Sequence, residues 1–212
     1  MLKQAVLKIM ARLTKRQVSS WASKPVETQK KQLGYLIKRA LKTSFGQAHS
    51  FSKINNYEDF KNHVPVRDYE DLSEYFEQIK EGKENVLWPG KPLYLAVTSG
   101  TTSGSKYIPI TKQSLPNHLN GAKIALLMYV AETGKVDFVN GKFIFVQGSP
   151  VLSKISGILT GRLSGISAHH VPFFMKKNML PSWSTNIIEE WENKIEGIVK
   201  ETIEEDMTII SG

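Results

Sequence analysis

The sequence lacks cysteine entirely and contains no long apolar run. Without cysteine the chain can form no disulfide, no thiolate metal site and no cysteine nucleophile. The longest unbroken apolar run, Ile124–Ala131, spans eight residues, far fewer than the roughly 20 needed to cross a bilayer. The first ten residues also lack the continuous apolar core of a secretory signal. We therefore expect a cytoplasmic protein with no integral membrane segment.

The positive charge is concentrated at one end of the chain. The net charge of +8 divides into +10 for residues 1–42, which hold eleven Lys or Arg and one acid, and −2 for the remaining 170 residues. No glycine–aromatic RNA motif accompanies this basic segment, so we expect no nucleic-acid partner. The 212 residues are enough for one sizeable core or for one domain with a smaller appendage, and 41% hydrophobic with 23% charged residues is typical of a soluble globular chain.

The basic segment has the periodicity of two helices, separated at Lys24-Pro25 because proline disfavours a helical residue before it. The apolar residues at helical spacing are Leu2, Val6, Ile9, Met10 and Leu13 in the first, and Leu33, Leu36, Ile37, Ala40 and Leu41 in the second. We predict a helical hairpin over residues 1–45 whose apolar faces pack on a body formed by residues 46–212. The alternative is a surface for an anionic membrane or nucleic acid.

Strands alternate with helices along the body, which predicts an α/β fold with a mostly parallel sheet flanked by helices. Helices are expected to start at the capping residues Asn56 and Asp68. The helix at 112–133 is expected either to start late or to kink at Pro116, and a long helix is expected over 183–206, broken at Gly197. Strands are expected over residues 93–97, 108–110, 142–147 and 207–210, with loop within 148–165. The last strand ends at Ser211-Gly212, where ligand loops of such folds begin, so we expect a fragment of a longer protein.

One hydroxyl-rich segment between two predicted strands suits a polyphosphate. It consists of Thr98, Ser99, Gly100, Thr101, Thr102, Ser103, Gly104, Ser105 and Lys106. Glycines let the backbone approach phosphates, free amides form a concave anion site, and a lysine places a compact positive charge. The spacing differs from the loop of P-loop ATPases, because three residues separate Gly100 from Gly104. Composition alone leaves a phosphate site and a plain surface turn equally supported.

The residue order resembles the Ser-Gly-Thr-Thr-Gly-x-Pro-Lys phosphate signature of adenylate-forming enzymes. This signature and three flanking blocks, Val64–Leu72, Leu87–Gly90 and Lys106–Pro109, resemble the auxin-responsive (Gretchen Hagen) acyl acid–amido synthetases, and the bacterial members more than the plant ones. The resemblance covers nearly the whole chain, which looks like less than half of a family enzyme. The signature glycine is displaced to Gly104 and its proline is Ser105. The adenine, ribose and magnesium contacts are expected beyond Gly212.

The resemblance implies a partial N-terminal domain of an adenylate-forming enzyme. Family members use ATP and Mg²⁺ to activate a small carboxylic acid as an acyl-adenylate, which an amine or amino acid then attacks to form an amide. Thr98, Ser99, Gly100, Thr101, Thr102, Ser103 and Gly104 would cradle the phosphates. Lys106 would be the catalytic cation that offsets charge on the departing pyrophosphate. His170 and Phe173 would line the acyl pocket. The fragment alone is expected to be inactive.

Other chemistry-bearing residues are assigned structural roles. Adjacent histidines such as His169-His170 cannot both face one ion from a regular element, and we predict no metal site. We predict solvated helix faces for Glu189, Glu190, Glu192, Glu201, Glu204 and Glu205. Two alternatives to a ligase remain: a non-catalytic fragment or pseudoenzyme that binds nucleotide or a partner, and a basic surface-binding module built on residues 1–42.

Overall fold

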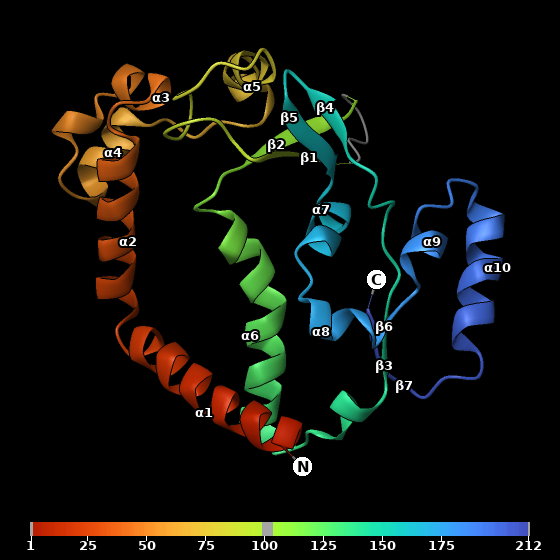
Figure 1. The fold of residues 1–212 in the computed structure, drawn as a ribbon. Helices are drawn as coiled ribbons and strands as arrows, with labels where there is room; N and C mark the ends of the chain where they lie inside the picture. The colour runs from red at the N-terminus through yellow and green to blue at the C-terminus, as the bar shows by residue number, and fades with distance from the viewer. Residues whose placement is uncertain (1, 99–103, 212) are drawn as a thin grey trace.

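The protein contains two separate β-sheets, one at the top of the view and one at the lower right, with helices between and beside them (Figure 1). The computed structural model describes residues 2–98 and 104–211. Sheet A has the order β2-β1-β5-β4, with strands β1 Tyr94–Thr98, β2 Lys106–Ile110, β4 Ser153–Ile155 and β5 Ile158–Arg162. Sheet B has the order β6-β3-β7, with strands β3 Lys142–Phe145, β6 Met179–Leu180 and β7 Met207–Ser211. The predicted α/β class is confirmed, but the strands divide between two sheets.

Strand direction brings the ends of β1, β2 and β5 together at one edge of sheet A. β1 runs parallel to β5 and antiparallel to β2. The carboxyl ends of β1 and β5 therefore lie at the same edge as the start of β2. Pro109 lies in β2, the edge strand, as expected because proline has no N–H to donate to a neighbouring strand. In sheet B, β3 is parallel to both of its neighbours.

The two predicted N-terminal helices are present as α1 Leu2–Ala22 and α2 Pro25–Ala40. α1 packs on α6 (Leu115–Thr133) through Leu7 and Ala11, which join a cluster of buried residues on and after α6. The predicted packing face of α1 was wrong, because its apolar stripe is exposed: Leu2, Val6, Ile9, Met10 and Leu13. The small side chain of Ala11 allows the close approach to α6 instead. The stripe of α2 does pack, through Ile37 and Ala40.

The predicted helix starts are confirmed. The Asn56 side chain accepts a hydrogen bond from the Asp59 N–H and caps α4 (Tyr57–His63). The segment that begins at Asp68 forms the short helix η2 (Glu70–Leu72) and then α5 (Ser73–Lys80). Gly82 follows with a φ of +91°, which favours glycine and ends the helix. α6 begins at Leu115 with Pro116 in its first turn, as the delayed start predicted.

Two segments differ in part from expectation. Residues 148–165 contain the predicted loop, at 148–152, and also the unpredicted β4–β5 hairpin, whose turn residues Ser156 and Gly157 both have positive φ (46° and 79°). Residues 183–206 form two helices, α9 Trp183–Asn186 and α10 Trp191–Thr202, so the break falls before α10. Gly197 lies inside α10, where an added Cβ would stand 2.9 Å from the Thr185 Cγ2. This glycine therefore permits close packing of α9 on α10.

Short helices complete the structure: α3 Ser44–Ala48, η1 Phe51–Lys53, η3 Asp137–Asn140, α7 Leu163–His169 and α8 Phe173–Lys176. α7 and α6 cover one face of sheet A, where Ala96 packs with Ile110 and Ile166. The other face packs on α5 through Leu95 and Ile79. Among the helices that the structure describes, none has both the length and the apolarity of a membrane span.

Two glycine substitutions test the packing of α3 against the end of α2. An added Cβ at Gly46 would lie 2.1 Å from the Ala40 carbonyl oxygen, a backbone atom that cannot move aside. We expect Gly46→Ala to lower the free energy of unfolding by about 1–3 kcal/mol. Gly121→Ala is the matched control, because no atom lies within 4 Å of its added Cβ in α6. It should raise the free energy of unfolding by up to about 1 kcal/mol. Urea unfolding measures both, and equal effects would contradict the packing at Gly46.

Candidate functional site

The turn between β1 and β2 begins and ends at two directly paired residues. Thr98, the last residue of β1, is the register partner of Lys106, the first residue of β2. Gly104 has a φ of +82° and no atom within 4 Å of an added Cβ, so glycine is required there by conformation and not by crowding. The other predicted phosphate-binding residues lie outside the described residues: Ser99, Gly100, Thr101, Thr102 and Ser103.

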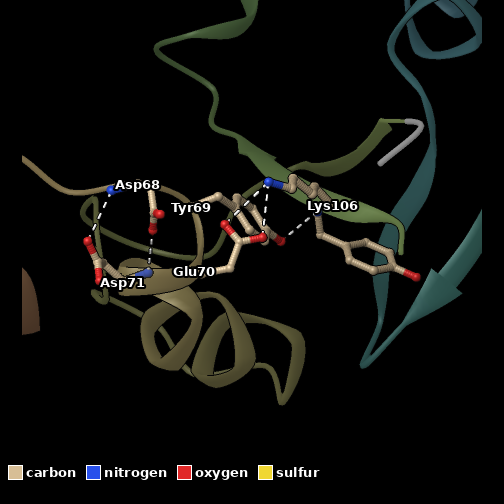
Figure 2. A network of polar contacts seen from close by, with 6 residues as sticks. Asp68, Tyr69, Glu70, Asp71 and Lys106 are labelled. Carbon is tan, nitrogen blue, oxygen red and sulfur yellow. Dashed lines mark hydrogen bonds and ion pairs between the residues drawn. The ribbon is translucent and has the colours of Figure 1, made fainter. Parts of the chain in front are cut away.

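The Lys106 ammonium is held at this turn by residues from a distant segment. Its Nζ lies 3.1 Å from Oε1 and 3.3 Å from Oε2 of Glu70. It also lies 4.8 Å from the centre of the Tyr69 ring, within range of a cation–π contact. Figure 2 shows the ammonium above both side chains. The Lys106 side chain keeps 31% of its surface exposed, so a ligand in solution can reach it.

Tyr69 joins this segment to β2. Its hydroxyl oxygen accepts a 2.8 Å hydrogen bond from the Tyr107 N–H. Its ring stacks on Phe76 of α5, with ring centres 4.5 Å apart and an interplanar angle of 16°. Phe76 is buried, so the Tyr69 ring has a rigid support. Tyr69 therefore fixes the start of β2 and places a π face beside the Lys106 ammonium.

Reciprocal hydrogen bonds shape the turn that carries Tyr69 and Glu70. The Asp71 N–H donates to Oδ1 of Asp68 at 2.9 Å, and the Asp68 N–H donates to Oδ2 of Asp71 at 3.2 Å (Figure 2). This arrangement satisfies two free amides at the helix start, as a capping box does. The sequence predicted the helix start here, but not that Tyr69 and Glu70 would contact Lys106.

The ion pair of Lys106 and Glu70 is weak enough for another anion to replace Glu70 as the partner of Lys106. Their side chains are 31% and 49% exposed, and surface ion pairs contribute only about 0–1 kcal/mol. A polyphosphate carries several negative charges and accepts stronger charge-assisted hydrogen bonds. The site can therefore hold Lys106 in place with Glu70 and release its ammonium to a more highly charged anion.

The structure does not bring the predicted acyl-pocket residues to this turn. The His170 Nε2 lies 3.0 Å from the Tyr94 hydroxyl, at the opposite end of β1 from Thr98. Phe173 is 78% exposed. The His169 Nε2 lies 2.8 Å from the Pro150 carbonyl oxygen, so the adjacent histidines have different partners. Within the described ranges, no group of three or more His, Cys, Asp or Glu residues could hold a metal ion. The acyl-pocket assignment stays a prediction.

One predicted solvated glutamate is a structural acceptor instead. The Glu201 carboxylate in α10 accepts hydrogen bonds from the Ser182 N–H, the Ser182 hydroxyl and the Thr185 hydroxyl. Burial favours the neutral form of Glu201, but the hydrogen bonds from Ser182 and Thr185 outweigh it and lower the pKa of this carboxyl. Glu201 therefore ties α10 to the start of α9.

Comparisons with known proteins identify the same family across most of the chain. The model of the GH3 family N-terminal domain matches residues 14–189. Indole-3-acetic acid-amido synthetase GH3.15 of Arabidopsis thaliana is 35% identical over 75 residues, which cover 34% of this chain and 13% of that protein. Indole-3-acetic acid-amido synthetase GH3.5 of Arabidopsis thaliana is 28% identical over 141 residues, which cover 64% of this chain and 22% of that protein.

The solved structures agree in fold. A structure of GH3.15 acyl acid amido synthetase superposes with a TM-score of 0.65 at 19% identity, over 86% of this chain and 32% of that chain. AtGH3.15 acyl acid amido synthetase in complex with 2,4-DB gives a TM-score of 0.60 at 21% identity, over 71% and 26% of the two chains. The chain thus spans about a third or less of the length of these relatives.

Removing single polar groups tests which contact stabilises the site. Tyr69→Phe removes the acceptor of a partly buried N–H, so we expect it to lower the free energy of unfolding by about 1 kcal/mol. Glu70→Gln removes the negative charge of an exposed ion pair, and loss of that pair should cost less than about 0.5–1 kcal/mol. Urea unfolding of both variants measures the difference. A larger loss for Glu70→Gln would show that the ion pair, and not Tyr69, holds the segment.

The lowered pKa of Glu201 predicts a pH dependence of stability. The folded-state pKa lies below the ordinary value of 4.5, so the stabilisation is present above 4.5 and is lost as the pH falls through the folded-state value. Glu201→Gln should therefore be less stable than the wild type at pH 7, and the difference should shrink below about pH 4.5. Unfolding measured at several pH values tests this. Glu204→Gln, at an exposed position of the same region, is the control and should show no such trend.

Proposed function

The chain belongs to the GH3 family through its N-terminal domain, and on this basis we propose that it carries the triphosphate-binding part of an ATP-dependent ligase. In the proposed reaction, a small carboxylic acid is activated as an acyl-adenylate with release of pyrophosphate. An amine or amino acid then attacks the acyl carbon, and an amide and AMP result. The observation that carries the proposal is the pairing of Thr98 with Lys106 across the β1–β2 turn.

The described residues fit a nucleotide triphosphate. The turn lies at the carboxyl end of β1, beside the carboxyl end of the parallel strand β5, which is where open α/β sheets bind ligands. Gly104 has a positive φ, a conformation that anion-binding turns also use. When bound, Mg²⁺-ATP supplies the adenylyl group and the pyrophosphate leaving group. The Thr98 hydroxyl and the Lys106 ammonium are the side-chain donors at the two ends of the turn.

Lys106 acts by electrostatics in this proposal. Its ammonium leaves Glu70 and binds oxygens of the outer phosphates, where negative charge grows as pyrophosphate departs. The Tyr69 ring, 4.8 Å from the Nζ of Lys106 in this structure, offers the ammonium a cation–π contact beside its two anionic partners. No general base is needed among these residues, because the carboxylate of the acid substrate is itself the nucleophile. The reaction draws on ATP and Mg²⁺, which supports a cytoplasmic location.

The relatives support the substrate class. Those named above are indole-3-acetic acid-amido synthetases and an acyl acid amido synthetase seen in complex with 2,4-DB. We propose the same classes of partner here, a small carboxylic acid and an amine or amino acid. The identities of the acid and of the amine are left to the assay, which uses a panel of carboxylic acids.

Loss of the Lys106 charge tests the proposal. In the protein expressed from its complete reading frame, Lys106→Ala should lower the rate of acid-dependent ATP–pyrophosphate exchange about thirtyfold, equivalent to about 2 kcal/mol for one charge-assisted contact. Lys154→Ala, on the exposed strand β4 at the opposite edge of sheet A, is the matched control and should exchange at the wild-type rate. Equal exchange by Lys106→Ala and wild type would contradict this role. Nucleotide binding by a wild type that never exchanges pyrophosphate would favour the non-catalytic alternative.

A further inference from the structure

Lys194 is a buried cation that the proposed reaction does not use. It lies on α10 and is 4% exposed. Its Nζ donates hydrogen bonds to the Gln147 carbonyl oxygen at 3.1 Å and to the Asn186 carbonyl oxygen at 2.9 Å. Within the described part of the chain it forms no ion pair with a carboxylate. Burial, and then the nearby charge of Arg162, lower the pKa of Lys194.

A buried ammonium without a carboxylate is costly, and an apolar side chain of similar length would pack at less cost. What Lys194 provides that an apolar side chain cannot is a link between two backbone segments. Asn186 ends α9, and Gln147 lies two residues beyond the end of β3. Lys194 therefore joins the carboxyl end of a central strand of sheet B to the turn before α10.

The segment held by Lys194 continues directly against sheet A. An added Cβ at Gly148 would lie 2.5 Å from the Arg162 Cδ, so the two residues are in close contact. The Gly148 N–H donates to the Ser164 hydroxyl oxygen at 3.3 Å. An added Cβ at Gly165 would lie 2.4 Å from the Ser149 carbonyl oxygen. Residues 147–150 are therefore wedged against the junction of β5 and α7.

This junction borders the candidate site. Arg162, the last residue of β5, is the parallel register partner of Val97, which immediately precedes Thr98. Hydrogen bonds and packing thus run from Lys194 through Gln147, Gly148 and Arg162 to the carboxyl end of β1. They connect the carboxyl edge of sheet B with the edge of sheet A at which the phosphate turn begins.

We propose that Lys194 is a positioning residue for nucleotide binding, because it fixes residues 147–150 against Arg162 and thereby the carboxyl ends of β5 and β1. The inference rests on the proposed function, since it assigns the phosphates of ATP to the turn after β1. Lys194 does not touch the nucleotide. It sets the positions of the carboxyl ends of β5 and β1, which lie at the nucleotide site.

The test compares Lys194→Met with Lys200→Met in the protein expressed from its complete reading frame. Methionine keeps the length and fills the buried space, while Lys200 is exposed on the same helix. We expect Lys194→Met to raise the KM for ATP in pyrophosphate exchange about tenfold, with the KM for the acid unchanged. Lys200→Met should match the wild type. A purely structural role would lower the active fraction, so kcat would fall and the KM for ATP would stay constant.

A second variant changes the contact between residues 147–150 and Arg162 directly. Gly148→Ala pushes on the Arg162 side chain without touching Lys194, so it should also raise the KM for ATP. The two effects should be less than additive in the double variant if both act through residues 147–150. If Lys194→Met fails to fold, Gly148→Ala alone decides. An unchanged KM for ATP in the folded variants, with exchange by the wild type, overturns the role of Lys194 only. No exchange by the wild type overturns the proposed function as well.

Discussion

The pairing of Thr98 with Lys106 is the constraint on which the account of this protein depends. Antiparallel pairing at the last residue of β1 and the first residue of β2 brings a hydroxyl and an ammonium to the two ends of one turn. The parallel strand β5 ends at the same place, because its last residue, Arg162, is the register partner of Val97. A shift of the register by one residue would send Lys106 to the other face of sheet A. The positions of Thr98 and Lys106 therefore depend first on the register of β1 and β2, and only then on side-chain contacts.

Two layers of contacts support that pairing. On one side, Tyr69 binds the Tyr107 amide and stacks on Phe76, so α5 carries the segment that holds Lys106. On the other side, residues 147–150 lie against Arg162 and are anchored by a buried lysine of α10. The contacts of Tyr69 include the Lys106 ammonium itself, whereas residues 147–150 support β5, the strand beside β1. The ion pair of Lys106 with Glu70 is exposed and therefore weak, which suits the exchange of partners proposed for Lys106.

Local features of the fold could be predicted from the sequence, and pairings between distant residues could not. Asn56 and Asp68 mark helix starts because a side chain caps amides three residues away. The turn between β1 and β2 stands out in the sequence because hydroxyls, glycines and a lysine occur within nine residues. Glu70 and Lys106 are 36 residues apart, and no periodicity relates them. The packing face of α1 was predicted wrongly because the helix has apolar residues on two sides, and the partner α6 selected the side with Ala11. Glu201 and Lys194 look like ordinary helix surface in the sequence, because their partners in α9 and in the segment after β3 are distant along the chain.

The most direct test of the central claim is a crystal structure of the protein with Mg²⁺ and a non-hydrolysable ATP analogue. The account predicts that the phosphate tail lies in the turn after β1, with the Lys106 Nζ bonded to phosphate oxygens and no longer paired with Glu70. A nucleotide bound elsewhere, with the pair of Lys106 and Glu70 intact, would contradict the account.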